Sequence, residues 1–200
     1  MAKLPMNYEN YVFDLYGTLV DIRTIEDDDK VWEILALFYG YYSALYSPEE
    51  LKETYGRLIV GKEKEMKYAH EACPEIEITE VFEDLFREKG VEPSKELAIH
   101  AGQFFRVLAT DYVKVYEGTE SMLEQLRAEG KNVYLLSNAQ RIFTEYEMHI
   151  LDIFKYFNGV LISSDYETKK PDQKFFDILL TSIQWIKPSH YFLEMILQLI

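Results

Sequence analysis

The stretch YVFDLYGTLVD, residues 11–21, runs from apolar residues into an aspartate and then into a glycine. Its first half is short, aromatic and β-branched, interrupted only by Asp14, and this composition predicts a buried strand. Gly17 predicts a sharp turn after the strand, because glycine tolerates backbone conformations that other residues avoid. The stretch therefore indicates a carboxylate delivered to the end of a strand, with a backbone at Gly17 that a ligand can approach closely.

The composition limits the kind of protein and the kind of partner. The chain has 200 residues, 48% of them hydrophobic, which is enough for one core domain with a modest insertion. Its formal net charge of −14 argues against nucleic acid and anionic membranes as partners, although a few local donors could still bind a small anionic substrate. Cys73 is the single cysteine, and the sequence shows neither a signal peptide nor a membrane span, so we expect a cytoplasmic protein.

The order of predicted helices and strands indicates two parts. Helical periodicity predicts helices over residues 31–42, 48–71, 78–89 and 94–108. Beyond them, strands at 132–136 and 160–163 alternate with helices at 119–129, 140–149 and 172–182, which implies a parallel sheet. The sequence thus predicts an α/β fold with a Rossmann-like core, residues 1–21 and 109–200, and an inserted all-helical cap, residues 22–108.

Polar side chains follow the predicted strands of the core. Asp14 ends the first strand, and Ser137 and Asn138 end the second, while a later loop carries Lys170. Because ligands of open parallel sheets bind at the carboxyl ends of the strands, we expect these side chains to share one edge. A carboxylate, a hydroxyl–amide pair and an ammonium supply a nucleophile, anion-binding donors and a neutralising cation, and Thr18 adds a hydroxyl.

The segments FDLYGTLVD, LLSNAQ and KKPDQKFF resemble the first three motifs of the haloacid dehalogenase-like hydrolase superfamily, in order and over nearly the whole chain. The resemblance implies that Asp14 is a nucleophile forming a covalent aspartyl intermediate. It implies that Thr18 and Ser137 hold the anionic group of the substrate and that Asn138 positions the site. Lys170 would offset the negative charge between nucleophile and substrate.

The resemblance also raises the questions of metal and reaction. In the metal-dependent members Mg²⁺ is held by the nucleophile, here Asp14, by the backbone carbonyl two residues on, here Tyr16, and by an acid of a fourth motif. Most phosphatases of the superfamily carry a second aspartate at the place of Tyr16, as general acid, whereas its metal-free 2-haloacid dehalogenases carry tyrosine. Those dehalogenases also place an arginine on the first cap helix, and none occurs between Arg23 and Arg57.

Three functions therefore stay open, all consistent with a small anionic substrate. We rank first a phosphatase acting on a small phosphorylated metabolite with Mg²⁺. The alternatives are a 2-haloacid dehalogenase without metal and a non-catalytic remnant that binds an anion or a partner.

The end of the chain departs from the family pattern. Residues 190–200 read HYFLEMILQLI, where the resemblance implies a strand followed by a fourth motif with paired acids. We expect the core to be incomplete there, or its last residues to be a frameshifted reading of an ordinary fourth motif. Without that acid the metal would retain Asp14 and one carbonyl, which predicts impaired activity. An exposed sheet edge and an apolar tail could also support a homo-oligomer.

Overall fold

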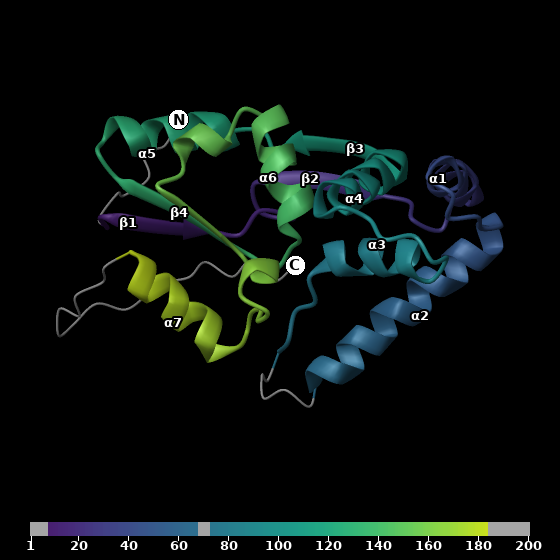
Figure 1. Ribbon diagram of the computed structural model, residues 1–200. Coiled ribbons are helices and arrows are strands. Elements are labelled where there is room, and N and C mark those ends of the chain that lie inside the picture. The colour runs from purple at the N-terminus through teal and green to yellow at the C-terminus, as the bar shows by residue number, and fades with distance from the viewer. Residues whose placement is uncertain (1–7, 68–72, 184–200) are drawn as a thin grey trace.

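The computed structural model describes residues 8–67 and 73–183 (Figure 1). The strands of this part are β1 (Asn10–Phe13), β2 (Val20–Thr24), β3 (Thr110–Val115), β4 (Asn132–Ser137) and β5 (Gly159–Ile162). Its α-helices are α1 (Asp29–Tyr41), α2 (Pro48–Lys67), α3 (Ile78–Arg87), α4 (Lys95–Ala109), α5 (Thr119–Ala128), α6 (Arg141–Ile150) and α7 (Gln173–Ser182). Among the described helices, none is both long and apolar enough to cross a membrane.

The core sheet is parallel and has the order β1-β4-β5. Helices α5 and α6 lie on one side of it and α7 on the other (Figure 1). The alternation of side chains explains both faces: Val133 and Leu135 of β4 belong to the cluster with α5, whereas Leu136 packs in the cluster with α7. This arrangement confirms the predicted α/β fold with a Rossmann-like parallel sheet. Because β1 and β4 are adjacent and parallel, the residues that follow them, Asp14 and Asn138, emerge at the same edge.

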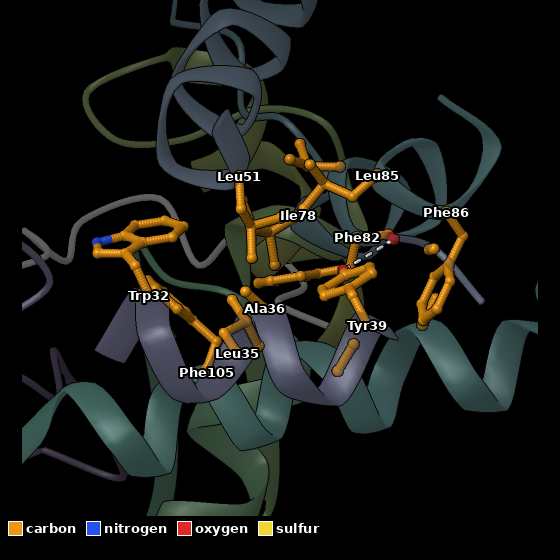
Figure 2. Close-up of a cluster of buried hydrophobic side chains, with 14 of the residues drawn as sticks. Trp32, Leu35, Ala36, Tyr39, Leu51, Ile78, Phe82, Leu85, Phe86 and Phe105 are labelled. Atoms are coloured by element: carbon orange, nitrogen blue, oxygen red, sulfur yellow. Dashed lines mark hydrogen bonds between the residues drawn. The ribbon is translucent and has the colours of Figure 1, made fainter. Parts of the chain in front are cut away.

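The helices α1 to α4 pack around a core of their own. Figure 2 shows its side chains converging from all four helices, with the hydroxyl of Tyr39 donating to the carbonyl oxygen of Phe82 at 3.1 Å. Tyr39 and Phe82 are fully buried, and Trp32 and Phe105 lie in aromatic contact with centroids 5.5 Å apart. The predicted helical insertion is therefore observed, with α2 followed to Lys67, before the first internal gap in the described residues.

One pair of strands was not predicted. Strands β2 and β3 form a separate antiparallel sheet, with Val20 opposite Val115 and Asp21 opposite Lys114. They carry the chain into the helical part and back out of it, beside α4 and α6 (Figure 1). Each is short and mostly half-exposed, so neither has the apolar run by which a strand is recognised in sequence. The domain limits proposed from sequence fall inside β2 and at the end of α4, and they stay a prediction.

The predicted fourth-motif region, the expected frameshifted end and the apolar tail lie outside the described residues. In the described sheet, β1 and β5 are the outer strands. The homo-oligomer expected from an exposed edge also stays a prediction.

Candidate active site

A tight turn places Asp14 directly after β1. The carbonyl oxygen of Leu15 accepts hydrogen bonds of 2.8 to 3.2 Å from three amides in the turn, those of Thr18, Leu19 and Val20. Gly17 has a φ of +76°, in the left-handed region that glycine enters without strain, and its amide donates to the carbonyl oxygen of Val20 at 2.9 Å. A β-carbon added at Gly17 would meet no atom within 4 Å, so the backbone conformation, and not a lack of space, favours glycine there.

Three donors surround the carboxylate of Asp14. Its Oδ1 accepts from the amide of Leu15 and from the hydroxyl of Ser137, each at 2.8 Å. Its Oδ2 lies 2.8 Å from Nζ of Lys170. A carboxylate has about four acceptor directions, so among the described contacts Oδ1 is filled and Oδ2 keeps one direction open. The Asp14 side chain is 39% exposed, so a small molecule can reach it from solvent.

Lys170 is fixed at both its ammonium and its backbone. Nζ donates to the carbonyl oxygen of Leu136 at 2.9 Å as well as contacting Asp14. Asn138 clasps the backbone of Lys170, accepting from its amide at 2.8 Å and donating to its carbonyl oxygen at 3.0 Å. Asn138 therefore contacts the lysine and not the aspartate, and the end of β4 fixes where the ammonium lies.

The predicted hydroxyl of Thr18 is not part of these contacts. Thr18 is exposed in the turn, and its amide donates to Leu15, but its hydroxyl has no hydrogen bond to any described residue. The structure thus brings together Asp14, Ser137, Asn138 and Lys170, and leaves Thr18 on the turn beside them.

The hydroxyl of Tyr16 lies in a polar network that sequence reasoning missed. It donates to Oε2 of Glu147 at 2.6 Å and lies 3.1 Å from the hydroxyl of Thr144. Arg106 of α4 donates through Nε to Oε1 of the same glutamate at 2.6 Å. Burial and the neighbouring carboxylate of Glu147 raise the pKa of Tyr16 well above its usual value of about 10, so the phenol holds its proton.

A second missed contact joins the segment before α3 to the loop before Lys170. Backbone hydrogen bonds link Glu75 to Glu167 at 3.1 Å and Lys169 to Cys73 at 2.9 Å. The buried carboxylate of Glu75 accepts from the hydroxyl of Ser163 at 2.9 Å and lies 3.5 Å from Nζ of Lys169. The helical part therefore contacts the core close to the lysine loop as well as at α6.

The donors proposed for Mg²⁺ are oxygens, the type this ion binds: the carboxylate of Asp14 and the backbone carbonyl of Tyr16. The open direction at Oδ2 of Asp14 suits a cation, but Lys170 already contacts that oxygen. No group of three or more histidine, cysteine, aspartate or glutamate side chains suited to a metal ion occurs in the described residues. These residues therefore fit part of a magnesium site, and the region where a fourth motif is expected lies outside the described residues.

Comparisons with solved structures find proteins that resemble this chain. The enzyme of the HAD family from Bacteroides thetaiotaomicron shares 18% identity and a TM-score of 0.51, with 90% of this chain and 80% of that chain covered. The L-2-haloacid dehalogenase from Xanthobacter autotrophicus has 17% identity and a TM-score of 0.45, over 90% and 66% of the two chains. A magnesium-bound HAD-hydrolase, YfnB from Bacillus subtilis, has 18% identity and a TM-score of 0.47, over 90% and 76%. At 18% identity, the likeness to the enzyme from Bacteroides thetaiotaomicron supports the fold alone.

A search of curated proteins found no match. A family model described as haloacid dehalogenase-like hydrolase matches residues 8–191, which include all three predicted motifs. The chain therefore belongs to the haloacid dehalogenase-like hydrolases.

Proposed function

We propose that this protein hydrolyses a small anionic substrate through a covalent intermediate on Asp14, and that the substrate is a phosphate monoester. One observation carries the proposal: an accessible carboxylate at the sheet edge is held by three donors and has one open direction on the oxygen that faces Lys170. A fixed nucleophile beside a fixed cation suits attack on an anion, because the cation reduces the repulsion between the two negative groups.

The reaction has two displacements at phosphorus. Oδ2 of Asp14 forms a bond to phosphorus as the ester oxygen leaves with the electron pair of the broken bond. Water then attacks the phosphorus of the acyl phosphate, which releases inorganic phosphate and restores Asp14. Ser137 and Thr18 are the hydroxyls that would hold the remaining phosphoryl oxygens. Mg²⁺, when bound by Asp14 and the carbonyl of Tyr16, would neutralise charge on the phosphoryl group.

The leaving group limits which substrates suit this site. A departing alkoxide needs a proton. The hydroxyl of Tyr16 already donates a hydrogen bond to Glu147, and its pKa is raised, so it is a poor proton donor. The proton must then come from water. Esters whose leaving group is a stable anion, such as aryl phosphates, should therefore react much faster than alkyl phosphates.

The lack of a proton donor at Tyr16 favours a second candidate, 2-haloacid dehalogenation, because a halide leaves without a proton. Oδ2 of Asp14 would attack the halogen-bearing carbon, expel halide and form an ester. Water would then attack the carbonyl carbon of that ester to release the 2-hydroxy acid. Arg106 of α4 lies near Tyr16, and two of its guanidinium nitrogens, Nε and Nη2, already donate to Glu147.

Oxygen-18 labelling in single-turnover reactions tests the two candidates. The full chain is mixed in oxygen-18 water with 4-nitrophenyl phosphate and Mg²⁺, or with 2-chloropropionate and a chelator, and Asp14→Asn is the control. A phosphatase puts the label into released phosphate, because water attacks phosphorus. A dehalogenase puts it into the Asp14 carboxylate, which mass spectrometry of the peptide detects. Product from neither substrate, or product that persists in Asp14→Asn, would overturn the proposal, and binding of phosphate without turnover would favour a non-catalytic remnant.

A further inference from the structure

Helix α6 stands between the core sheet and α4, the last helix of the inserted part (Figure 1). We propose that Glu147, on α6, is a positioning residue that couples the helical cap to the nucleophile turn by binding Arg106 and Tyr16 at the same time. Its effect on turnover rests on the proposed use of Asp14 as nucleophile. The coupling itself is a property of the fold and can be measured without turnover.

Glu147 joins three parts of the chain that are distant in sequence. Its Oε2 accepts from the hydroxyl of Tyr16 at 2.6 Å and from Nη2 of Arg106 at 3.4 Å, and its Oε1 accepts from Nε of Arg106 at 2.6 Å. Thr144, one turn earlier on α6 and fully buried, lies 3.1 Å from the same tyrosine hydroxyl. Tyr16 is two residues after Asp14, so the carboxylate of Glu147 holds the turn that carries the nucleophile.

Burial increases the free-energy cost of breaking the contacts of Glu147. The side chain of Glu147 is 8% exposed and that of Arg106 is 16% exposed. A charge withdrawn from water is costly unless it is paired and hydrogen-bonded, so loss of either partner leaves the other charge poorly satisfied. Although burial lowers the pKa of Arg106, its hydrogen bond to Glu147 raises it, and the net shift is upward. Both donors to Glu147 therefore remain protonated at neutral pH.

Gly102 of α4 allows this helix to pack closely against α6. A β-carbon at this position would lie 2.6 Å from Cδ1 of Ile142 and 2.8 Å from the ring of Phe82. Gly102 therefore permits close helix contact one turn before Arg106. The guanidinium carbon of Arg106 then lies 5.2 Å from the ring centre of Phe143 and 5.8 Å from that of Tyr16. The arginine is placed by packing on both sides, not only by its charge.

A movement of α4 can be transmitted to the turn that carries Asp14. Arg106 is in the last turn of α4, where the chain leaves the helical part through β3, and β3 pairs with the strand that follows the nucleophile turn. A displacement of α4 would pull on Glu147, and through Tyr16 on the turn after Asp14. Substrate contacts made by the cap can in this way alter the orientation of the carboxylate.

The test is a double-mutant cycle of Glu147→Gln and Tyr16→Phe, read by hydrogen exchange of the amides of residues 15–20 in the full chain. Glu145→Gln is the matched control, since Glu145 lies on the same helix and pairs with Arg141 at the surface. We expect each single variant to speed exchange of these amides by about tenfold, the size of one lost hydrogen bond, and the double variant to add little more. Glu145→Gln should leave their exchange unchanged.

Kinetics supply the second readout. If the wild-type chain is active, Glu147→Gln should lower kcat at every pH and leave KM within about twofold. The reason is that the substitution misplaces the nucleophile and leaves the groups that bind the substrate unchanged. Additive effects in the exchange cycle, or unchanged exchange of residues 15–20 in Glu147→Gln, would overturn the coupling. An inactive wild type with the expected exchange pattern would reject the proposed function alone.

Discussion

Nζ of Lys170 lies 2.8 Å from Oδ2 of Asp14, although the two residues come from opposite ends of the chain. The same ammonium is bonded to the carbonyl oxygen of Leu136, at the end of the strand between β1 and β5. The cation is thus held by the sheet itself and not by the aspartate alone. In the proposed reaction its position would persist while the carboxylate of Asp14 changes from a free anion to a covalent intermediate.

Replacing Lys170 by glutamine should lower kcat/KM by about 10²- to 10³-fold, the range for loss of one preorganised group facing developing charge. The free energy of unfolding should fall by about 1 to 2 kcal/mol, because the Lys170 side chain is only 14% exposed and its ammonium also donates to Leu136, whereas Asp14 stays partly solvated. Steady-state kinetics and denaturant unfolding measure the two effects. Lys169→Gln is the matched control, because the ammonium of Lys169 lies 3.5 Å from Glu75 and does not contact Asp14. Activity of this variant should fall less than about threefold. Equal losses in both variants would contradict a specific role for Lys170.

Asn138 should act through Lys170. Asn138→Ala removes both hydrogen bonds to the backbone of Lys170, and we expect kcat to fall about tenfold with little change in stability, since Asn138 is exposed. Asn138→Asp keeps the acceptor for the amide of Lys170 but loses the donor to its carbonyl, so its kcat should be intermediate. The comparison of kcat across the three proteins checks this order. An aspartate variant worse than the alanine variant would show that charge, and not the clasp, matters at this position.

The residues around Asp14 could be predicted because one rule of parallel sheets acts on short stretches of sequence. Asp14 and Ser137 end adjacent strands, so recognising two apolar runs was enough to bring them to one edge. The helices could be predicted for a similar reason, since the spacing of apolar residues is a local signal. Helix α4 (Lys95–Ala109) accordingly lies within one residue of the predicted range 94–108 at both ends.

The network of Tyr16 could not be predicted because its partners are far away in sequence. Glu147 lies in a helix with polar neighbours, where a glutamate is ordinarily exposed, and only its spacing of three residues from Thr144 hints at a shared buried face. Strands β2 and β3 were missed because each is paired only with the other, and the whole helical insertion separates them in sequence. Their pairing depends on the return of the chain after α4, which no local pattern contains.

Gly102→Ala tests the close contact between α4 and α6. Alanine favours a helix over glycine by up to about 1 kcal/mol, but its β-carbon would collide with the buried ring of Phe82. Overpacking costs about 1 to 3 kcal/mol, so we expect the free energy of unfolding to fall by about 1 to 2 kcal/mol. Gly56→Ala, on the exposed side of α2 with no atom within 4 Å of the added carbon, should instead be neutral or stabilising. Chemical denaturation of both variants measures the difference, and a stabilised Gly102→Ala would mean that α4 and α6 have room to separate.

Alkaline unfolding should report on the buried tyrosines. Burial raises the pKa of Tyr16, Tyr39 and Tyr55, and a neighbouring carboxylate raises that of Tyr16 further, so the folded protein keeps these phenols protonated. The unfolded chain loses the same protons near pH 10 and then binds fewer protons than the folded state, so stability is complete below about pH 10 and falls as the pH rises. Each such tyrosine contributes a slope of up to about 1.4 kcal/mol per pH unit.

The slope due to Tyr16 can be separated with one substitution. Tyr16→Phe removes the hydroxyl while keeping the ring that packs near Arg106. Its free energy of unfolding should therefore decline less steeply than that of the wild type, by about 1 kcal/mol between pH 10 and 11, because the unfolded tyrosine is only half ionised at pH 10. Urea unfolding at a series of pH values, with the same series for Tyr41→Phe, makes the comparison. Tyr41 is 86% exposed, so its removal should leave the slope of the wild type unchanged. If Tyr16→Phe also follows the wild-type slope, the phenol ionises as readily folded as unfolded, and Glu147 does not hold its proton in place.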